Sequence, residues 1–359
     1  MTVNASLSGH KEKKPSSSRR RRKRSGAART GLPLIAALDL GTNNCRLMIA
    51  QSKYPSFRVV DGYSKAVRLG EGLVFSGRLS EEAIARTLST LRICKQKIFR
   101  HGVSLGRYVA TEACRQAING EEFLLRVKEE IGLHLETISS EEETKLTING
   151  CFPLLRESSQ PFALTFDVGG GSAEITLVDL KSGSPIICDW VSVPHGVVTL
   201  TERYQASNIS ASNYQKMVCE IRDALLPFER KHDIGEKISG GLVQVLGTAG
   251  TVTTIAGIHM ELKKYDRTIV DGSWLDLAVI QEISQQLVSL TFDERAALAC
   301  IGRGRAELVV AGCAVLQAIC EVWPAKRIRV ADRGIREGIL LSLARDVSDK
   351  GQNFRNGKK

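Results

Sequence analysis

The chain has 359 residues, which is more than one ordinary hydrophobic core organises, so its length predicts at least two domains. Hydrophobic residues make up 43% and charged residues 25%, which is normal for a soluble globular protein. No apolar run reaches the roughly 18 to 20 residues that a membrane-spanning helix needs, so we expect no membrane contact. The first residues also lack the apolar region of a secretory signal, and their basic block lacks the apolar face of a transit peptide.

The formal net charge of +11 is concentrated at the N-terminus. Up to Pro33 the chain has ten lysines and arginines and one glutamate, which gives this segment a net charge of +9. The rest of the chain therefore has a net charge of about +2. Residues 1–33 are therefore predicted to be a disordered basic tail, because they have no apolar surface to bury. Such a tail could bind polyanions non-specifically through counterion release, and the alternative is a solvated arm without a partner.

The nine cysteines form no CxxC pair and no metal-binding pattern. Most of them stand in apolar runs, as Cys219 and Cys320 do. We expect buried thiols that pack as small hydrophobic groups in a reducing compartment, which favours a cytoplasmic protein.

The first half of the folded body predicts a strand hairpin, a third strand and then alternating helices and strands. The hairpin strands are apolar enough to be covered on both faces, and Ser80 is the expected N-cap of a long helix. The expected strands are 33–44, which runs into a polar turn, 45–52, 56–67, 106–113, which ends at a functional loop, and 133–139. The expected helices are 80–101, 121–131 and 141–155.

The second half repeats the strand–turn–strand pattern that opens the first half. Residues 162–180 again give a strand, an acidic turn and a strand, and 184–196 a third strand. A strand, a Gly/Thr turn and a helix follow in 243–258, and a last strand and helix in 327–344. The sequence therefore predicts an internal duplication, with two halves facing each other across a cleft. The expected domains are residues 34–158 and 159–347, the final helix packing back on the first domain, with a disordered tail at 348–359.

Three glycine- or threonine-rich turns follow buried strands. Turns of this kind present backbone N–H groups to an anion without a clash from a Cβ atom, and a helix that starts in one adds its positive end. One such turn is a weak signal, but three together predict phosphate binding. The candidate phosphate-binding residues are Asn43, Asn44, Arg46, Gly169, Gly170, Gly171, Ser172, Gly247, Thr248, Gly250 and Thr251.

Acidic residues accompany two of these turns. Asp39 and Asp167 end the first strand of each hairpin, and Glu174 begins a returning strand. Because carboxylates repel phosphate, their presence predicts a divalent cation between the two, and an oxygen-only site suits Mg²⁺ or Mn²⁺. The alternative for a single Asp is a turn residue that caps loop amides.

Ten ordered sequence blocks together resemble one family. They look like the exopolyphosphatase and guanosine pentaphosphate phosphatase (Ppx/GppA) family, within the actin, sugar-kinase and heat-shock chaperone ATPase superfamily. The resemblance covers roughly Leu34 to Ala344. It implies an α/β fold of two ribonuclease H-like domains with mixed sheets flanked by helices, and a homodimer is plausible from it alone. The blocks are DLGTNNCRLMI, VRLGEGL, ATEACRQAIN, ISSEEETKL, DVGGGSAE, SVPHGVVTLTE, LGTAGTVTTIA, YDRTIVDG, GRGRAELVVAG and ADRGIREG.

The resemblance also implies roles for single residues. The ISSEEET block puts the family's catalytic base on Glu143, with Glu142 as the fallback, and Ser140 is the expected cap of the helix that starts there. Arg115 matches the residue that neutralises charge on the transferred phosphoryl group. Asp39, Asp167 and Glu174 match the family's metal and phosphate region.

Four positions depart from the family pattern. Ser140 stands in place of a common Gly, Thr144 of a common Ala and Glu307 of a common Asp. His195 stands where an apolar residue is usual, and a hydrogen-bonded structural histidine is expected there in preference to a phosphate ligand. Arg303 and Arg305 either line the cleft or are solvated.

The function predicted from all of this is an exopolyphosphatase that removes terminal phosphate from inorganic polyphosphate. Removal of the 5′ terminal phosphate of guanosine pentaphosphate is the closest alternative, since both substrates end in a phosphoanhydride. The basic tail favours polyphosphate, because a flexible cation raises the local concentration of a polyanion. Two further alternatives are an ATP-dependent kinase of the same superfamily and a phosphate-chain sensor without catalytic activity.

Overall fold

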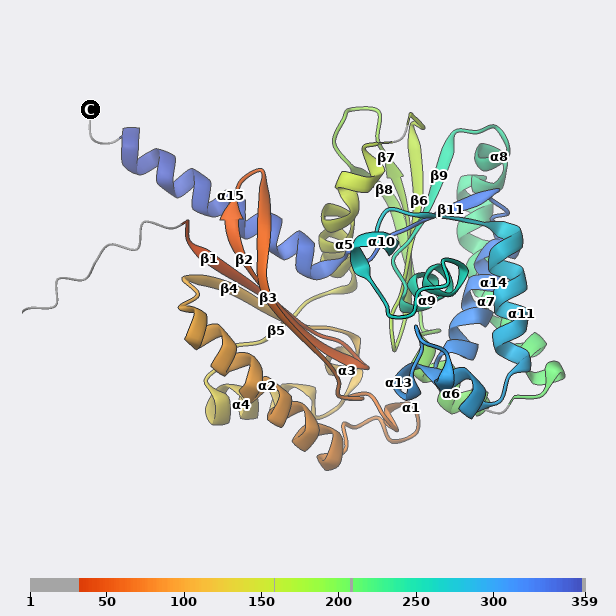
Figure 1. Ribbon diagram of the computed structural model, residues 1–359, viewed down its shortest axis with the longest axis horizontal. Helices are drawn as coiled ribbons and strands as arrows, with labels where there is room; N and C mark the ends of the chain where they lie inside the picture. The colour runs from red at the N-terminus through yellow and green to blue at the C-terminus, as the bar shows by residue number, and fades with distance from the viewer. Residues whose placement is uncertain (1–31, 158, 207–208, 357–359) are drawn as a thin grey trace, which may run out of the picture. The chain divides into compact units, whose positions relative to one another are not determined.

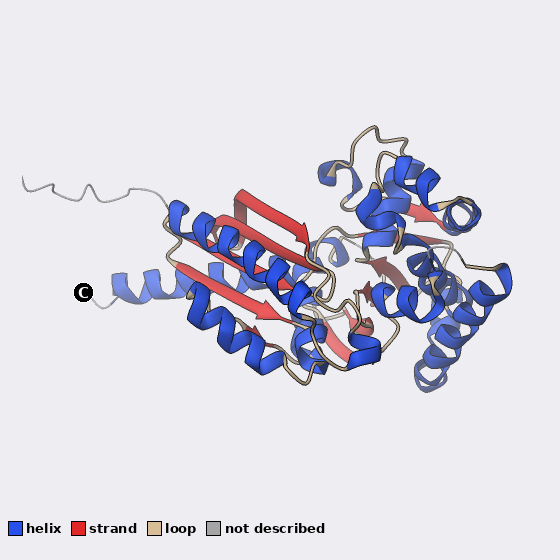
Figure 2. Ribbon diagram, turned by 90° about the horizontal axis from the view of Figure 1, so that it is seen from below, coloured by secondary structure: helices blue, strands red, loops and turns tan. Residues whose placement is uncertain are grey.

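The computed structural model describes residues 32–157, 159–206 and 209–356, so the basic tail lies outside the described residues. Two mixed sheets with helices packed along their strands organise this part of the chain (Figures 1 and 2). None of its helices is long and apolar enough to cross a membrane. All nine cysteines are free thiols. Seven are buried, as expected, whereas Cys219 is half-buried and Cys188 is exposed.

The first sheet has five strands in the order β3-β2-β1-β4-β5. β1 pairs antiparallel with β2 and parallel with β4, and β2 pairs antiparallel with β3. The strands are β1 (Leu34–Leu40), β2 (Asn44–Lys53), β3 (Ser56–Ala66), β4 (Leu105–Ala110) and β5 (Glu136–Thr137), and the helices of this half are α1 (Leu73–Ser76), α2 (Glu81–His101), α3 (Glu112–Gln116), α4 (Gly120–Ile131) and α5 (Ser140–Leu155).

The second sheet has six strands in the order β10-β11-β9-β6-β7-β8. Its strands are β6 (Phe162–Val168), β7 (Ala173–Asp179), β8 (Ile186–Val193), β9 (Val243–Gly247), β10 (Trp274–Asp276) and β11 (Arg327–Val330). Its helices are α6 (Val197–Tyr204), α7 (Ala211–His232), α8 (Ile234–Ser239), α9 (Gly250–His259), α10 (Arg267–Val270), α11 (Leu277–Ser289), α12 (Phe292–Ala297), α13 (Arg303–Ala306), α14 (Val309–Val322) and α15 (Ile335–Asn356).

The strand order confirms the internal duplication. The order β3-β2-β1-β4-β5 of the first sheet recurs in the second as β8-β7-β6-β9-β11. In both sheets the opening hairpin is antiparallel, and its first strand pairs in parallel with a later strand. Equivalent hairpin tips therefore lie at the same edge of each sheet.

The alternation of side chains explains why the first sheet is covered on both faces. Ala36, Leu38 and Leu40 of β1 pack into a core with α2 and α4. Ile35 and Ala37 point the other way and pack with residues of α15. Successive side chains of a strand point to opposite faces, so an apolar run such as β1 requires helices on both sides.

Two helices cross over between the sheets. α5 follows the first sheet in sequence, yet Ile148, Cys151 and Leu154 pack on Ala163 and Val178 of the second sheet. α15 follows the second sheet but packs on β1 and β2 of the first (Figure 1). α15 also continues to Asn356, beyond residue 347 where the sequence pattern ended, because residues 345–350 contain no helix-breaking proline.

The helix boundaries follow local signals, with one correction. The Ser80 side chain accepts a hydrogen bond from Ala83 N at 3.2 Å, as expected of the N-cap of α2. The expectation that Ser140 caps α5 is wrong. Ser139 is the cap, since its side chain accepts from Glu142 N at 3.2 Å.

Candidate active site

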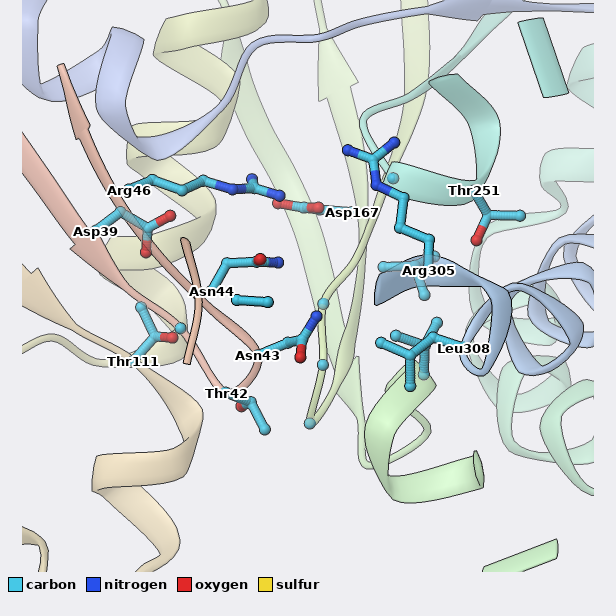
Figure 3. A pocket seen from close by; sticks show the side chains of 18 of the residues that line it. Asp39, Thr42, Asn43, Asn44, Arg46, Thr111, Asp167, Thr251, Arg305 and Leu308 are labelled. Atoms are coloured by element: carbon cyan, nitrogen blue, oxygen red, sulfur yellow. The ribbon is translucent and has the colours of Figure 1, made fainter. Parts of the chain in front are cut away.

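A cavity of about 370 Å³ lies where the two hairpin tips, the start of α9 and the segment around α13 meet. Figure 3 shows side chains of the first hairpin on one side of it and Thr251, Arg305 and Leu308 on the other. Residues of all three predicted turns line this cavity, together with Glu143 of α5 and Arg305 of α13. The predicted residues in the lining are Asp39, Asn43, Asn44, Arg46, Glu143, Asp167, Gly169, Gly170, Gly171, Ser172, Thr248, Gly250, Thr251 and Arg305. Among the predicted phosphate-binding residues, Gly247 is not part of the lining.

The backbone fixes the tip of the first hairpin. Gly41 N donates to Asn44 O at 2.9 Å and closes the turn. Asn43 O accepts from Val67 N and Arg68 N, each at 2.9 Å, so the segment after β3 holds the turn from behind. Asn43 and Asn44 are left with their side chains at the cavity (Figure 3).

The second hairpin repeats this turn and packs closely against the first. Gly169 N donates to Ser172 O at 2.9 Å, which matches the bond in the first turn. A Cβ on Gly170 would lie 2.8 Å from Cβ of Thr42, and one on Gly171 would lie 2.8 Å from Cγ of Glu112. The two glycines are therefore required by the approach of the two halves as well as by access of the backbone to an anion.

The third turn puts the start of a helix at the cavity. Thr248 N donates to Phe166 O at 2.9 Å, which holds the turn beside the second hairpin. α9 begins at Gly250, and Gly250 and Thr251 both line the cavity. The free N–H groups of this first helical turn present partial positive charge to a bound anion.

Glu143 lies in the first turn of α5, with a side chain that is only 13% exposed. Its Oε2 accepts a hydrogen bond from Nη1 of Arg115 at 2.8 Å. Burial and repulsion by Glu174 raise the pKa of Glu143 well above its usual range, and Arg115 opposes this shift. A carboxyl group with a raised pKa takes up a proton more readily at neutral pH, as a general base must.

Arg115 is held by protein groups on several sides. It donates to Glu112 Oε2 through Nε at 3.0 Å and Nη2 at 2.6 Å, and to Ile138 O through Nη1 at 2.7 Å. The structure thus brings Arg115 to Glu143 but leaves it out of the lining of the large cavity, so its predicted contact with the transferred phosphoryl group stays a prediction.

Glu142 points elsewhere. Its Oε1 accepts from Nη1 of Arg107 at 2.9 Å, and Arg107 also binds Glu136. Because Glu143 lines the cavity and Glu142 does not, the geometry favours Glu143 as the base.

Two guanidinium groups supply positive charge to the cavity. Arg46 stands opposite Asp39 in the β1–β2 register, and Figure 3 shows its side chain extending toward Asp167. Arg305 donates to Thr254 Oγ1 at 3.2 Å, and desolvation followed by the charge of Arg46 lowers its pKa. Both arginines line the cavity, where an anionic ligand can reach them.

The arginines of the GRGRAE block separate into two roles. Arg303 faces outward, with a 78% exposed side chain 3.5 Å from Asp293, whereas Arg305 lines the cavity. The sequence did not distinguish the two, because α13 is a single short turn whose orientation is set by its contacts with the rest of the fold.

The three acidic metal candidates do not occupy equivalent places. Asp39 and Asp167 line the cavity, and burial raises the pKa of both, that of Asp167 to about 6. Glu174 lies behind the second hairpin, where its Oε1 accepts from Ser172 Oγ at 2.6 Å and Ser192 Oγ at 2.9 Å. Across the part of the chain that the structure describes, no three His, Cys, Asp or Glu side chains converge as a metal centre.

His195 lies buried, and its Nδ1 has no hydrogen-bond partner, with Glu220 Oε1 at 3.7 Å. Burial lowers its pKa. It does not line the cavity, as expected of a structural histidine, but the hydrogen bond that was also expected is not formed at Nδ1.

The sequence interpretation missed several residues that line the cavity. Thr111 and Glu112 follow β4 directly, and Ser64 and Ala66 belong to β3. The only available signal was the strand that ends at Ala110, because strand ends often carry functional loops. Ile301, Leu308 and Val309 form an apolar side of the cavity, and no role was predicted for them although the last two lie in the GRGRAELVVAG block.

The fold and the cavity together define an α/β protein with a polar cavity between two duplicated halves. Comparisons with known proteins agree. The model of the Ppx/GppA phosphatase family matches residues 48–346, and the chain belongs to this family. It is 31% identical over 327 residues to exopolyphosphatase 2 of Mycobacterium tuberculosis, which covers 87% of this chain and 99% of that relative.

Solved structures give the same result. A Ppx/GppA family member from Aquifex aeolicus has a TM-score of 0.70 and 27% identity, covering 88% of this chain and 98% of the other. An exopolyphosphatase from Cytophaga hutchinsonii has a TM-score of 0.78 and 25% identity, covering 87% and 98%. The α/β fold with two mixed sheets flanked by helices is therefore confirmed.

Proposed function

We propose that the protein is an exopolyphosphatase, which uses water to release the terminal phosphate of inorganic polyphosphate. Its family and its similarity to a protein named exopolyphosphatase support a phosphoanhydride hydrolase. The observation that carries the proposal is the Glu143 carboxyl group, which has a raised pKa and borders a cavity lined by phosphate-binding turns and two arginines.

The chain's own groups bind the terminal phosphate. Backbone N–H groups of Gly170–Ser172 and of the first turn of α9 donate to phosphate oxygens, and Arg46 and Arg305 neutralise negative charge. These donors are fixed before the substrate arrives, because the hydrogen bonds within the turns hold the loops. Such preorganised groups stabilise charge that develops in the transition state.

Glu143 orients a water molecule and takes its proton as the water oxygen attacks the terminal phosphorus. A bond forms between the water oxygen and phosphorus, and the bond from phosphorus to the bridging oxygen breaks. The shortened chain leaves with the bridging oxygen and its electron pair, and phosphate is released. Arg115 holds the Glu143 carboxylate through its 2.8 Å hydrogen bond while the proton is transferred.

A divalent cation, Mg²⁺ or Mn²⁺, is part of this proposal. Mg²⁺ is commonly bound by one or two carboxylates together with substrate phosphate oxygens, and two buried carboxylates at the cavity fit that mode. Asp39 and Asp167 would hold the ion, and Glu174 would support the hairpin from behind. When bound, the ion would neutralise charge on the phosphate oxygens.

The test is phosphate release by the purified full-length protein with long polyphosphate, guanosine pentaphosphate or ATP, each with and without Mg²⁺. Glu143→Gln should lower kcat about 10²- to 10⁴-fold, because a positioned general base contributes that much. The matched control is Glu142→Gln, since Glu142 is the neighbouring acid and binds Arg107 outside the cavity.

Each arm of the assay can reject a part of the proposal. Equal losses in the two Gln variants would reject Glu143 as the base. Faster cleavage of guanosine pentaphosphate would replace the substrate, and ATP-dependent phosphorylation of an alcohol would point to a kinase. Binding of polyphosphate without any phosphate release would identify a sensor. Homodimer formation and cytoplasmic location stay predictions.

A further inference from the structure

A second, much smaller cavity of about 10 Å³ lies behind Glu143, between α5 and the β6–β7 hairpin. It is lined by residues of one face of α5 and one face of the two strands: Glu143, Thr144, Thr147, Ile148, Thr165, Asp167, Glu174 and Thr176. Glu143 and Asp167 line both cavities, so their side chains separate the inner cavity from the large one.

Two hydroxyl groups at this inner cavity lack partners. Oγ1 of Thr144 and Oγ1 of Thr147 are buried without a hydrogen bond, and the two residues are 2% and 6% exposed. Buried hydroxyls almost always have a partner in a folded protein. The pair at i and i+3 lies on one side of the helix, which is the side that faces the second sheet.

Threonines on another helix of this chain behave differently. On α2, Thr87 Oγ1 donates to Ala83 O at 2.7 Å and Thr90 Oγ1 donates to Arg86 O at 3.0 Å. This bond to the preceding turn is the usual way for a helical threonine to satisfy its hydroxyl. Thr144 and Thr147 do not form it, so their hydroxyls are available to an occupant of the cavity.

The other walls of the cavity restrict the chemistry of that occupant. Glu143 and Glu174 repel each other across it, and Arg115 reaches only Oε2 of Glu143. The occupant has to be small, accept from threonine hydroxyls and donate to carboxylates. A water molecule does all three, requires two to four polar partners, and fits a space of about 10 to 15 Å³.

We propose that this inner cavity binds one water molecule, held by the Thr144 and Thr147 hydroxyls and donating its hydrogens to Glu143 and Glu174. Thr144 and Thr147 are then positioning residues, which act on the reaction through the water and the Glu143 carboxylate. The kinetic consequence rests on the proposed function, whereas the water site does not.

The direct test is a crystal structure of the full chain and of Thr147→Val, which keeps the shape of the side chain but loses the hydroxyl. The wild type should contain one ordered water about 2.7 to 3.0 Å from Oγ1 of Thr144 and of Thr147. That water should be absent or displaced in the variant. Threonine hydroxyls bonded instead to the α5 backbone, with no water between them, would overturn the proposal.

Kinetics separate positioning from folding. Thr147→Val should lower kcat for polyphosphate about tenfold with KM changed less than about twofold, and Thr147→Ser should restore most of kcat. Thr90→Val is the matched control, because it removes a buried threonine hydroxyl from α2, far from this cavity in the fold. Equal losses of kcat in the two Val variants would overturn the positioning role.

Three further outcomes separate folding, the water site and the proposed function. If Thr147→Val does not fold, Thr144→Val gives the same comparison, since the water should lose one of its partners in either variant. If the wild type releases no phosphate from polyphosphate while the water is present in the crystal, the proposed function is wrong and the water site stands. If a fully active wild type contains no such water, the water site is wrong and the proposed function stands.

Discussion

Gly338 of α15 packs directly on the backbone of α5, which carries Glu143. A Cβ at Gly338 would lie 2.0 Å from the carbonyl oxygen of Leu146 and 2.8 Å from its carbonyl carbon. The contact is reciprocal, because a Cβ at Gly150 of α5 would lie 2.2 Å from Gly334 O. The obstructing atoms belong to the backbone, so no side-chain rotation can relieve the clash.

Gly338→Ala should therefore push the two helices apart. An ordinary contact of a Cβ needs about 3.4 Å, so α5 and α15 must separate by about 1.4 Å at this point. Overpacking of a core costs about 1–3 kcal/mol, which lowers Tm by several degrees in a protein of this size. Leu146 lies three residues after Glu143, and a misplacement of about 1 Å at a catalytic group reduces the rate about 100-fold.

Thermal unfolding and phosphate release from polyphosphate measure the two effects. We expect a lower Tm and a lower kcat with a smaller change in KM, because the proposed phosphate-binding turns belong to the two hairpins and the start of α9, and not to α5. Gly334→Ala is the matched control, since no heavy atom lies within 4 Å of the Cβ it would add. Wild-type Tm and kcat in Gly338→Ala, or equal losses in both variants, would refute the reasoning.

Two further predictions concern charge. Lys231 and His232 lie 2.6 Å from Asp189 and lower its pKa to about 2. This depressed pKa stabilises the fold above the ordinary carboxyl pKa of about 4, and the contribution is lost as pH falls through 2. Asp189→Asn should thus cost under about 1 kcal/mol at pH 7 for this partly exposed cluster, with the deficit shrinking in urea unfolding at pH 3. A deficit that grows at pH 3 would contradict the assignment. Deletion of the first thirty residues should raise KM for long polyphosphate at low salt but not at high salt, and an unchanged KM at low salt would exclude capture by the tail.

Local patterns predicted the parts of this protein that depend on neighbouring residues. The strand–turn–strand pattern around Asp39 and Asp167 located both hairpins, and Ser80 with two following acids located the start of α2. The cap of α5 was misplaced by one residue, since two adjacent serines are equivalent in sequence. Only the geometry decides that the Ser139 hydroxyl reaches Glu142 N.

Such local patterns could not predict contacts between segments that are distant in the sequence. The apolar face of α5 fits either sheet equally well in sequence, yet it packs on the second sheet while α15 packs on the first. Arg303 and Arg305 likewise had equal weight in the sequence, and Glu142 and Glu143 had similar weight. Which member of each pair reaches the cavity depends on the orientation of a short helix or a helical turn.

The sequence by itself determined the duplicated α/β architecture, the glycine-rich turns that line the cavity and the resemblance to the family, because periodicity, glycine turns and ordered motifs are properties of contiguous residues. Only the tertiary structure decided that Arg115 contacts Glu143, that Glu174 supports a hairpin from behind, and that two threonine hydroxyls border an inner cavity. These contacts depend on how α5 packs between the two sheets. The physical reason is that hydrogen bonds and burial act over a few ångströms in space, between residues that the chain separates by dozens of positions.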